Sequence, residues 1–493
     1  MSINADVIIV GFGPAGATAA LTAAKRGADV LIAEKQSLAS HMTSAHMTSG
    51  GVIMSVSDVN AAVRYLDACA GGLTPSVVNR AWASRASAIP EWLDTHGIAT
   101  ARVRGGFHES FDGHDSIDVL AMSPAASDHL EPSVLRHMAV PGVSLPEPRG
   151  SGFPRAIETA ALNHPRVRLA ESSRARRLVR NGPRVSGVLC VDRSGRRIEM
   201  AATSGVVLAS GGFQFDEALK RDHLSGEPIH FYGAHCSTGD GIRMAQLAGA
   251  DLWHMNCMVG RAVGHFDLED QGLTFMLSLS PPPYMIIDQS GRRFTDESAQ
   301  AKFHPYFYQH LLPFDPNTSR YYRIPSYWIL DGQRLASGPL TPAEQGLSRV
   351  GRYRWSSDNS REIGLGWISP APSIPSLAEA IGVDAARLQE TFDDYQEACR
   401  LGHDRYGRPR ETLLPFEEGP LFAVRLFPGG ASTLGGPRRD AQARVIDADG
   451  TPIEGLFAAG ELGSVIGRLY PAAGSNYADA VAFGQIAAET ATA

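Results

Sequence analysis

Short apolar runs and one alanine-rich segment alternate at the start of the chain. Residues 7–10 (VIIV) and 30–33 (VLIA) are apolar runs of strand length, and residues 14–25 between them (PAGATAALTAAK) have the composition of a helix. Further runs at 204–209 (SGVVLA) and 455–459 (GLFAA) are flanked by glycine and predict two more buried strands. This alternation predicts an α/β fold.

The loop between the first strand and the helix, GFGPAG, is rich in glycine. Gly11 permits a tight turn, Gly13 lets the backbone approach a pyrophosphate, and Gly16 lets the helix pack closely on the strand. Pro14 and Ala15 begin the helix, whose first N–H groups are then directed at the phosphates. The loop predicts a Rossmann-like dinucleotide site.

A carboxylate follows the second strand. Glu34 lies 23 residues after Gly11, where it can accept hydrogen bonds from a ribose. Two later strand ends, at Ala209 and at Gly460-Glu461, carry small residues that would let an extended cofactor pass over the sheet. Because these elements lie hundreds of residues from Gly11, a long cofactor such as FAD is favoured over NAD.

Composition narrows the class of protein. The 493 residues are 43% hydrophobic and carry a net charge of −7, which gives no general attraction to nucleic acid or to an anionic membrane. The five cysteines are scattered, no metal-ligand spacing is present, and no apolar run reaches the length of a membrane span. A strand is predicted within a few residues of Met1, so we expect no signal peptide and a cytoplasmic location.

The longer motifs resemble one flavoprotein family. They are GFGPAG, TSGGV (48–52), LASGGF (208–213), STGDGIRMAQLAGADL (237–252), GRRFTDES (291–298), HDRYGR (403–408), GLFAAGE (455–461) and YPAAGSN (470–476). In this order they resemble the FAD-dependent fumarate reductases and 3-ketosteroid dehydrogenases, and the resemblance spans nearly the whole chain.

The resemblance implies a discontinuous FAD-binding domain, residues 1–277 and 431–493, with an α+β capping and catalytic domain inserted at 278–430. Two amphipathic helices are predicted within the insertion, at 373–402. By analogy the active site lies between cap and flavin. The sequence shows no second glycine-rich turn of the kind that a dedicated NAD(P)H domain would carry. We therefore expect an external electron acceptor or donor.

Further cofactor contacts come from the resemblance alone. They are expected at Lys35, Ser49, Gly50, Gly51 and Asp240, and at backbone N–H groups near Gly474, Ser475 and Asn476, which would stabilise a reduced flavin. His41 and His46 do not stand at the spacing expected for covalent attachment, so FAD is expected to bind non-covalently.

The fumarate and succinate enzymes carry two histidines and two arginines at positions where this sequence has other residues. Their two histidines fall near Arg261 and Ser432, and their two arginines fall at Ala301 and Tyr470. Fumarate and succinate are therefore poor candidates as substrates. Arg261 remains a candidate for binding an acidic substrate.

The closing segment instead resembles that of the 3-ketosteroid dehydrogenases, in which a tyrosine hydroxyl and a glycine N–H hold the ring carbonyl. Tyr470 and Gly474 stand at the matching positions. The implied reaction removes an α-proton next to a ring ketone and transfers the β-hydrogen as hydride to flavin N5, while the two donors stabilise the enolate. A 3-ketosteroid is one candidate, and another cyclic ketone would use the same contacts.

The base is harder to place, because the family tyrosine after the RFxNE motif falls at Ala301. His304, Tyr306 and Tyr308 lie close by, and we favour Tyr306. Two alternatives remain open: a reductase of a cyclic enone in a biosynthetic pathway, and a non-redox FAD-binding protein or a flavoprotein subunit that needs a partner.

Overall fold

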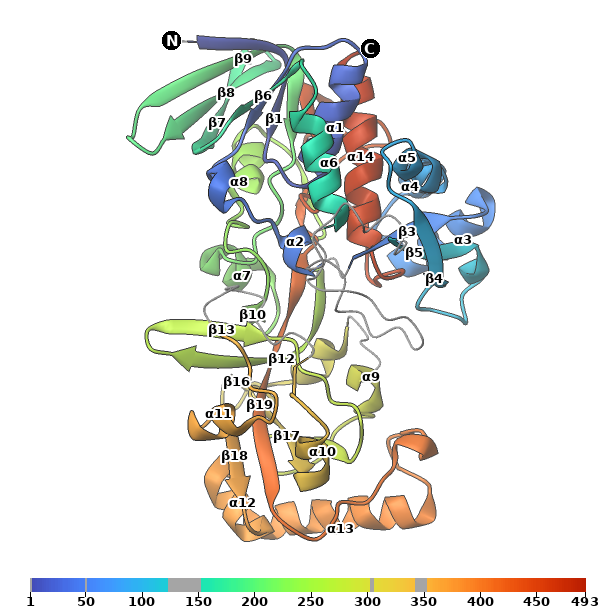
Figure 1. Cartoon of the computed structure of the whole chain (residues 1–493), viewed down its shortest axis with the longest axis vertical. Coiled ribbons are helices and arrows are strands. Elements are labelled where there is room, and N and C mark those ends of the chain that lie inside the picture. Colours follow the sequence, from blue (N-terminus) through green and yellow to red (C-terminus); the bar gives the residue numbers. More distant parts are fainter. Residues whose placement is uncertain (1, 49–50, 123–151, 302–305, 342–352) are drawn as a thin grey trace. The chain divides into compact units, whose positions relative to one another are not determined.

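The computed structural model describes residues 2–48, 51–122, 152–301, 306–341 and 353–493. The chain divides into two compact units (Figure 1). The first comprises Met1–Leu224, Ala234–Met258 and Ser432–Ala493, and the second comprises Ser225–Gly233 and Val259–Ala431.

The first unit is built on an eight-stranded sheet with the order β21-β22-β9-β1-β2-β6, extended by β7 and β8 beside β9. Strand β1 pairs in parallel with both β2 and β9, and β9 pairs in parallel with β22. The strands are β1 (Ser2–Val10), β2 (Val30–Ala33), β6 (Val167–Ala170), β7 (Ser173–Asn181), β8 (Arg184–Asp192), β9 (Arg197–Leu208), β21 (Arg444–Ile446) and β22 (Pro452–Ala458). The predicted strand–helix–strand unit and the two later strands are present, which confirms the α/β fold.

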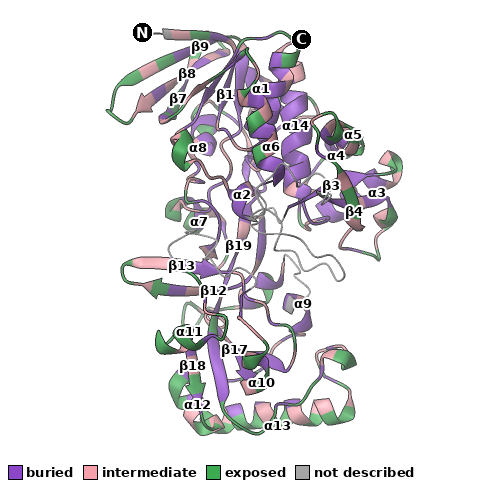
Figure 2. Cartoon of the chain, in the orientation of Figure 1, coloured by how far each residue is buried: buried purple, intermediate pink, exposed green. Residues whose placement is uncertain are grey.

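Three helices pack together on this sheet: α1 (Pro14–Lys25), α6 (Gly152–Leu162) and α14 (Ser475–Ala491) (Figure 1). The closing helix α14 is buried along nearly all its length (Figure 2). Its small side chains allow this, since a Cβ on Gly484 would lie 2.8 Å from Ala15 O on α1. The alanine-rich sequence of both helices therefore serves close helix–helix contact.

A small antiparallel sheet completes the first unit, with the order β3-β5-β4. Its strands are β3 (Val52–Val56), β4 (Thr100–Arg104) and β5 (Ile117–Met122), and the helices beside it are α3 (Val59–Ala70), α4 (Ser76–Ser87) and α5 (Ile89–Asp94). Gly474, at the start of α14, lies against β3, because a Cβ there would be 2.6 Å from Val52 O. Shorter elements are α2 (Ser44–Thr48), α7 (Glu217–His223), α8 (Asp240–Leu247), β11 (Leu252–Trp253) and β20 (Gly436–Pro437).

The second unit contains a seven-stranded sheet with the order β13-β12-β19-β17-β14, with β10 and β18 also paired to β19. Its strands are β10 (His230–Phe231), β12 (Met258–Leu268), β13 (Gln271–Phe275), β14 (Tyr284–Ile287), β17 (Ser326–Asp331), β18 (Ile368–Ala371) and β19 (Leu421–Thr433). Alternate residues of β14 belong to different cores, Tyr284 and Ile286 to one and Met285 and Ile287 to the other. This two-residue period shows that both faces of the sheet are covered.

Helices α12 (Ile374–Ile381) and α13 (Ala385–Leu401) supply Leu377, Leu388 and Tyr395 to one of these cores. They are the two amphipathic helices predicted at 373–402. Shorter elements of the unit are α9 (Ser298–Ala301), α10 (Gly332–Ala336), α11 (Ser360–Gly364), β15 (Phe314–Asp315) and β16 (Arg320–Tyr321).

Four buried charges join the two motifs GRRFTDES and HDRYGR in the second unit. Arg293 bonds to Glu297 at 2.6 Å and to Asp404 at 2.8 Å. Arg408 approaches Glu297 at 3.3 Å and donates to the carbonyl of Tyr284 at 2.7 Å. Because all four charged groups are almost completely buried, each depends on its partners.

The second compact unit begins earlier than the domain expected at 278–430. Its longer segment starts at Val259, because β12 and β13 pair as a hairpin and β12 joins β19 in the sheet of that unit. Residues 225–233 also belong to it, since β10 pairs with β19. The capping role assigned to this unit stays a prediction.

Candidate functional site

The carboxyl ends of four parallel strands define one edge of the main sheet. Strands β2, β1, β9 and β22 end in register, with Val10 opposite both Ala33 and Leu208, and Leu208 opposite Ala458. The loops that follow these strands are 11–13, 34–37, 209–216 and 459–474. This edge is where open α/β sheets bind their ligands.

The glycine loop is shaped by close backbone contacts. Gly11 has φ +100°, and a Cβ on it would lie 2.6 Å from Ala209 O. A Cβ on Gly16 would lie 2.0 Å from Gly11 O. Gly13 differs, because among the described residues only Thr43 lies within 4 Å of its Cβ position, at 3.6 Å. Gly11 and Gly16 are therefore required by the fold, whereas Gly13 leaves its backbone open to a ligand.

The start of α1 offers N–H groups to an anion. Gly13 is its N-cap and provides no side-chain cap, while Pro14 opens the first turn. Gly460 has φ +72° and its Cβ position is 2.8 Å from the Cβ of Ala15, so the loop after β22 lies against this helix end. Two sequence-distant glycine turns thus border the same helix N-terminus.

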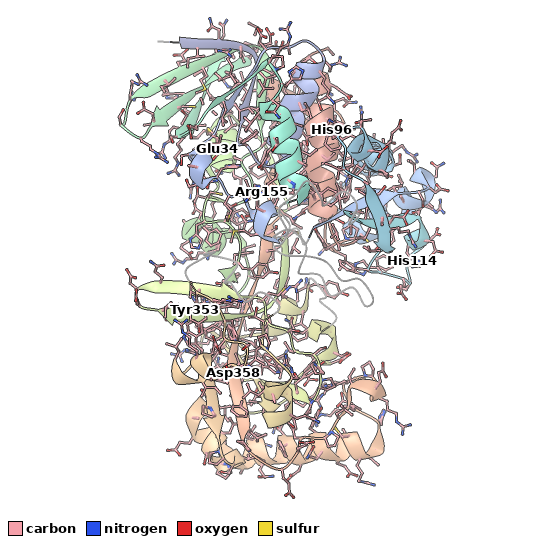
Figure 3. All side chains as sticks on the ribbon, in the orientation of Figure 1. Glu34, His96, His114, Arg155, Tyr353 and Asp358 are labelled. Atoms are coloured by element: carbon pink, nitrogen blue, oxygen red, sulfur yellow. The ribbon has the colours of Figure 1, made fainter. Side chains whose placement is uncertain are left out.

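Glu34 follows β2 at this edge (Figure 3). One carboxylate oxygen accepts the N–H of Phe12 at 2.9 Å and the other accepts the N–H of Gln36 at 2.8 Å. The side chain is buried and fixed to the glycine loop. Each oxygen retains a lone pair for a ribose hydroxyl, which fits the predicted role.

Lys35 and Asp240 contact each other. Lys35 Nζ lies 3.0 Å from Asp240, at the first residue of α8, and 2.8 Å from Thr238 Oγ1, while Arg174 donates two hydrogen bonds to the same carboxylate. Burial opposes ionisation of Asp240, but Arg174 and Lys35 outweigh it and hold its pKa below the usual range. The cluster joins β7, α8 and the loop after β2.

The carboxyl group of Glu461 lies among polar groups from two other segments. Gln214 donates to it, and Ser432 and the backbone at Gly212 and Thr433 also interact with it. Burial nevertheless raises the pKa of Glu461 to about 8. Near neutral pH this side chain is therefore largely a neutral carboxylic acid.

A buried ion pair fixes the loop that carries Glu461. The guanidinium of Arg439 donates to Gly460 O at 3.1 Å and pairs with Asp479 on α14, and both side chains are fully buried. Ser464 donates to the second oxygen of Asp479 at 2.9 Å. Sequence reasoning missed Arg439, Asp479 and Gln214, because no local pattern marks them.

His41 and His46 lie beside one buried carboxylate, Glu158 on α6. His46 Nδ1 accepts the N–H of Thr43 at 3.0 Å, so its Nε2–H donates to Glu158 at 3.1 Å. His41 Nε2 donates to Phe12 O at 3.0 Å. Burial lowers the pKa of His41, but Glu158 outweighs this and raises it above its usual value. The expectation of non-covalent FAD stays a prediction.

The closing segment places Tyr470 against the start of α14. Tyr470 Oη accepts the N–H of Asn476 at 3.1 Å, and Ser475 N–H donates to Ala472 O at 3.3 Å. Gly474 has φ +79° as the N-cap of α14, and within the described residues its N–H has no hydrogen-bond acceptor. The phenol and this N–H are the two donors predicted for a substrate carbonyl.

The other predicted residues fall elsewhere. Ser49 and Gly50 lie outside the described residues, and so does His304, while Gly51 is buried directly before β3. Arg261 lies on β12 of the second unit, with one guanidinium nitrogen 3.0 Å from Met276 Sδ. Tyr306 also belongs to the second unit, and burial raises its pKa.

The strand-end edge of the first unit fits FAD. Its glycine loop has no room for Cβ atoms at Gly11 and Gly16. Gly13, the N-cap of α1, leaves its backbone accessible, and Glu34 is hydrogen-bonded to the same loop. Two buried polar atoms, Ser210 Oγ and Asn476 Oδ1, lack a partner among the described residues. Such atoms are expected where a polar ligand completes the hydrogen bonding. Fold and site thus define a dinucleotide-dependent flavoprotein.

The family model described as an FAD binding domain matches residues 6–476, and the chain belongs to this family. It is 25% identical to 4-oxocyclohexanecarboxylate 2-dehydrogenase of Sinomonas cyclohexanicum, over 98% of this chain and 92% of that protein. It is 30% identical to 3-oxosteroid 1-dehydrogenase of Mycolicibacterium smegmatis, over 58% of this chain and only 52% of that relative.

Among solved structures, the fold is similar to 3-ketosteroid delta1-dehydrogenase of Sterolibacterium denitrificans in complex with 1,4-androstadiene-3,17-dione. The TM-score is 0.82 with 22% identity, and the match covers 99% of both chains. The resemblance to the FAD-dependent fumarate reductase and ketosteroid dehydrogenase flavoproteins is confirmed. The chain is an FAD-dependent oxidoreductase, of the dehydrogenases and reductases that act on CH–CH groups.

The comparisons leave some predictions open. Within the described residues no helix is long and apolar enough to cross a membrane. The electron partner stays a prediction, as do the cytoplasmic location and the roles of the individual site residues.

Proposed function

We propose that this enzyme acts on the carbon–carbon bond next to a ring ketone, and that Tyr470 and Gly474 bind the ketone oxygen. The observation that carries this proposal concerns two groups of the closing segment. The phenol of Tyr470 is half-buried and bonded to the start of α14, and the N–H of Gly474, in the same segment, has no acceptor within the described residues. A preorganised donor of this kind contributes about 3 kcal/mol when negative charge develops on the oxygen. FAD, when bound, supplies the acceptor or donor of the hydride.

The start of α14 makes Tyr470 a better donor. The N–H of Asn476 reaches its hydroxyl oxygen at 3.1 Å, and this N–H lies in the first turn of a 17-residue helix. The positive end of the helix dipole draws charge away from the oxygen, which strengthens the phenol O–H as a donor. The accepted hydrogen bond does not use the phenolic proton.

The substrate class we propose is a cyclic ketone that carries a carboxylate. Arg261 has one guanidinium nitrogen 3.0 Å from Met276 Sδ, and a guanidinium is the group that binds a carboxylate through charge-assisted hydrogen bonds. A relative aligned over 92% of its length is named for 4-oxocyclohexanecarboxylate, which combines a ring ketone and a carboxylate. A 3-ketosteroid is the second substrate candidate, supported by the 30% identical relative.

Tyr306 favours reduction of an enone as the alternative direction. Because burial raises its pKa, the phenolate form that would abstract a proton is scarce near neutral pH, whereas the neutral phenol can give one. Tyr306 is the acid or base that we propose. In the oxidative direction Tyr306 would be the base that removes the α-proton of the substrate. A neighbouring group must then first take up the phenolic proton of Tyr306.

The proposal is tested by anaerobic mixing of the holoprotein with saturated substrates while the flavin absorption is followed. The panel contains 4-oxocyclohexanecarboxylate, cyclohexanone and a saturated 3-ketosteroid. Bleaching by the keto acid supports the proposal in the oxidative direction. The dithionite-reduced holoprotein is mixed in parallel with 4-oxocyclohex-2-ene-1-carboxylate, where return of the yellow colour supports reduction. No response to any ring ketone or enone, with FAD bound, would overturn the proposal.

A further inference from the structure

The main chain around Tyr470 is bound by groups far away in the sequence. His108 Nε2–H donates to the carbonyl oxygen of Tyr470 at 3.1 Å across 362 positions. Tyr65 Oη donates to the carbonyl oxygen of Pro471 at 2.7 Å across 406 positions, and the N–H of Phe107 donates to the same oxygen at 2.8 Å. The two successive peptide planes that follow Tyr470 are therefore both fixed from outside their own segment.

The side chain of Tyr470 is held at its other end. Its hydroxyl accepts the N–H of Asn476, and its ring lies 6.3 Å from the ring of Phe107, centroid to centroid. The residue is half-buried, so packing alone does not determine where the phenol is directed. The hydrogen bonds at its carbonyl and at its hydroxyl therefore help to fix its direction.

Tyr65 connects these contacts. It is fully buried on α3, and its hydroxyl accepts the N–H of His108 at 3.2 Å while donating to Pro471. Burial raises the pKa of Tyr65, so the hydroxyl stays protonated and remains a donor. Glycine at 106 makes room for it, because a Cβ there would lie 2.7 Å from Tyr65 Oη.

We propose that His108 and Tyr65 are positioning residues, which hold the Tyr470–Pro471 peptide so that the Tyr470 phenol stays directed at the substrate ketone. This inference rests on the proposed function of Tyr470. The two residues act through hydrogen bonds to carbonyl groups and do not touch the reacting atoms. Positioning of this kind matters because an error of about 1 Å can lower a rate by roughly 100-fold.

The test compares His108→Leu with His108→Gln and Tyr65→Phe in the holoprotein. Leucine keeps bulk but has no donor, whereas the glutamine amide can present an N–H at nearly the reach of Nε2. Thr74→Val is the matched control, because buried Thr74 donates to the carbonyl of Val465 at 2.7 Å in the same closing segment, five positions before Tyr470. The content of bound FAD and the Tm of each variant are measured first.

The first readout needs no substrate. The chain contains 13 tyrosines, and labelling with 3-fluorotyrosine gives each one a fluorine signal, with that of Tyr470 identified by its absence from Tyr470→Phe. The Tyr470 signal is expected to shift or broaden in His108→Leu and Tyr65→Phe, and to keep its native position in His108→Gln and Thr74→Val. An unchanged signal in both His108→Leu and Tyr65→Phe would overturn the inference.

The second readout is turnover of the ring ketone or enone that responds in the substrate panel. His108→Leu and Tyr65→Phe should lower kcat by roughly tenfold or more with little change in KM, and His108→Gln should recover to within about threefold of native. In a Tyr470→Phe background, His108→Leu should cost nothing further, because its effect passes through the phenol. Losses that multiply, or a glutamine variant as slow as the leucine variant, would contradict positioning.

The two hypotheses fail in different ways. Full turnover by Tyr470→Phe would refute the proposed function, whatever the fluorine signals show. Slow turnover by Tyr470→Phe together with native kcat in both His108→Leu and Tyr65→Phe would leave the proposed function standing and refute positioning alone.

Discussion

The hydroxyl oxygen of Tyr470 accepts a hydrogen bond from the backbone N–H of Asn476 at 3.1 Å. Six positions separate the two residues, and between them Gly474 turns the chain with φ +79° into α14. A phenol, a glycine N–H and a helix N-terminus are thereby gathered within one short segment. This relationship supports the expectation that the segment binds developing negative charge.

Replacing Tyr470 by phenylalanine removes one of the two proposed donors. We expect bound FAD and the Tm to stay near native, since the half-buried ring is kept, and kcat to fall by roughly 100-fold. Steady-state kinetics with the responding ring ketone measures the loss. Native turnover would show that the phenol does not bind the reacting carbonyl.

Replacing Arg261 by leucine removes the proposed contact with an acidic substrate. A charge-assisted hydrogen bond contributes about 1.5–3 kcal/mol, so KM for 4-oxocyclohexanecarboxylate should rise by roughly tenfold or more. KM for the neutral ketone cyclohexanone should not change. Arg425→Leu, an exposed arginine on β19 of the same unit, is the matched control. Equal effects on acid and neutral ketone would remove Arg261 from carboxylate binding.

Alanine at position 474 is expected to destabilise the protein by about 3 kcal/mol or more, because its Cβ would meet Val52 O and Ile53 Cα at 2.6 Å in a left-handed conformation. Urea unfolding of the holoprotein measures the change. Gly182→Ala is the control, since its φ is also positive, +60°, but none of the residues that the structure describes lies within 4 Å of its Cβ position. A loss no larger than in the control would mean that strain alone, and not contact with β3, selects glycine at 474.

Glu461 should make stability depend on pH. Its pKa in the folded protein, about 8, lies above the ordinary value of 4.5, so its contribution is fully present below pH ~4.5 and is lost as pH rises through 8. Glu461→Gln cannot ionise and should remove this part of the decline, on the order of 4 kcal/mol between pH 5 and pH 9. Urea unfolding at each pH tests this, and identical pH profiles for native and variant protein would contradict it.

Glu297→Gln is expected to destabilise the second unit, because it leaves Arg293 and Arg408 with less compensating charge in a buried site. Breaking a buried pair in this way typically costs about 3–5 kcal/mol. The control is Glu397→Gln, whose partner Arg400 is exposed, so that losing this surface ion pair should change the stability little. Urea unfolding of the holoprotein compares them. Equal, small effects would show that the network is dispensable.

Much of the fold and part of the site could be predicted from the sequence. The glycine loop, Glu34 and the strand ends at Ala209 and Gly460 were expected at one ligand-binding edge, and the structure brings them together there. These features are local, because glycine turns and apolar runs act through backbone conformation and strand period within a few residues. The domain bounds 278–430 stay a prediction. The start of the second compact unit at Val259 has no local signal, since the pairing of β12 with β19 joins segments about 160 residues apart.

The sequence by itself determined the α/β class, the dinucleotide edge and the spacing of Tyr470 and Gly474, all of which follow from short-range rules of backbone and side-chain pattern. Only the tertiary structure decided which groups surround those residues. Arg439 pairs with Asp479 across 40 positions, and Tyr65 reaches Pro471 across 406. Such contacts depend on where the folded chain places distant segments, because a buried donor binds whichever acceptor the packing brings within reach.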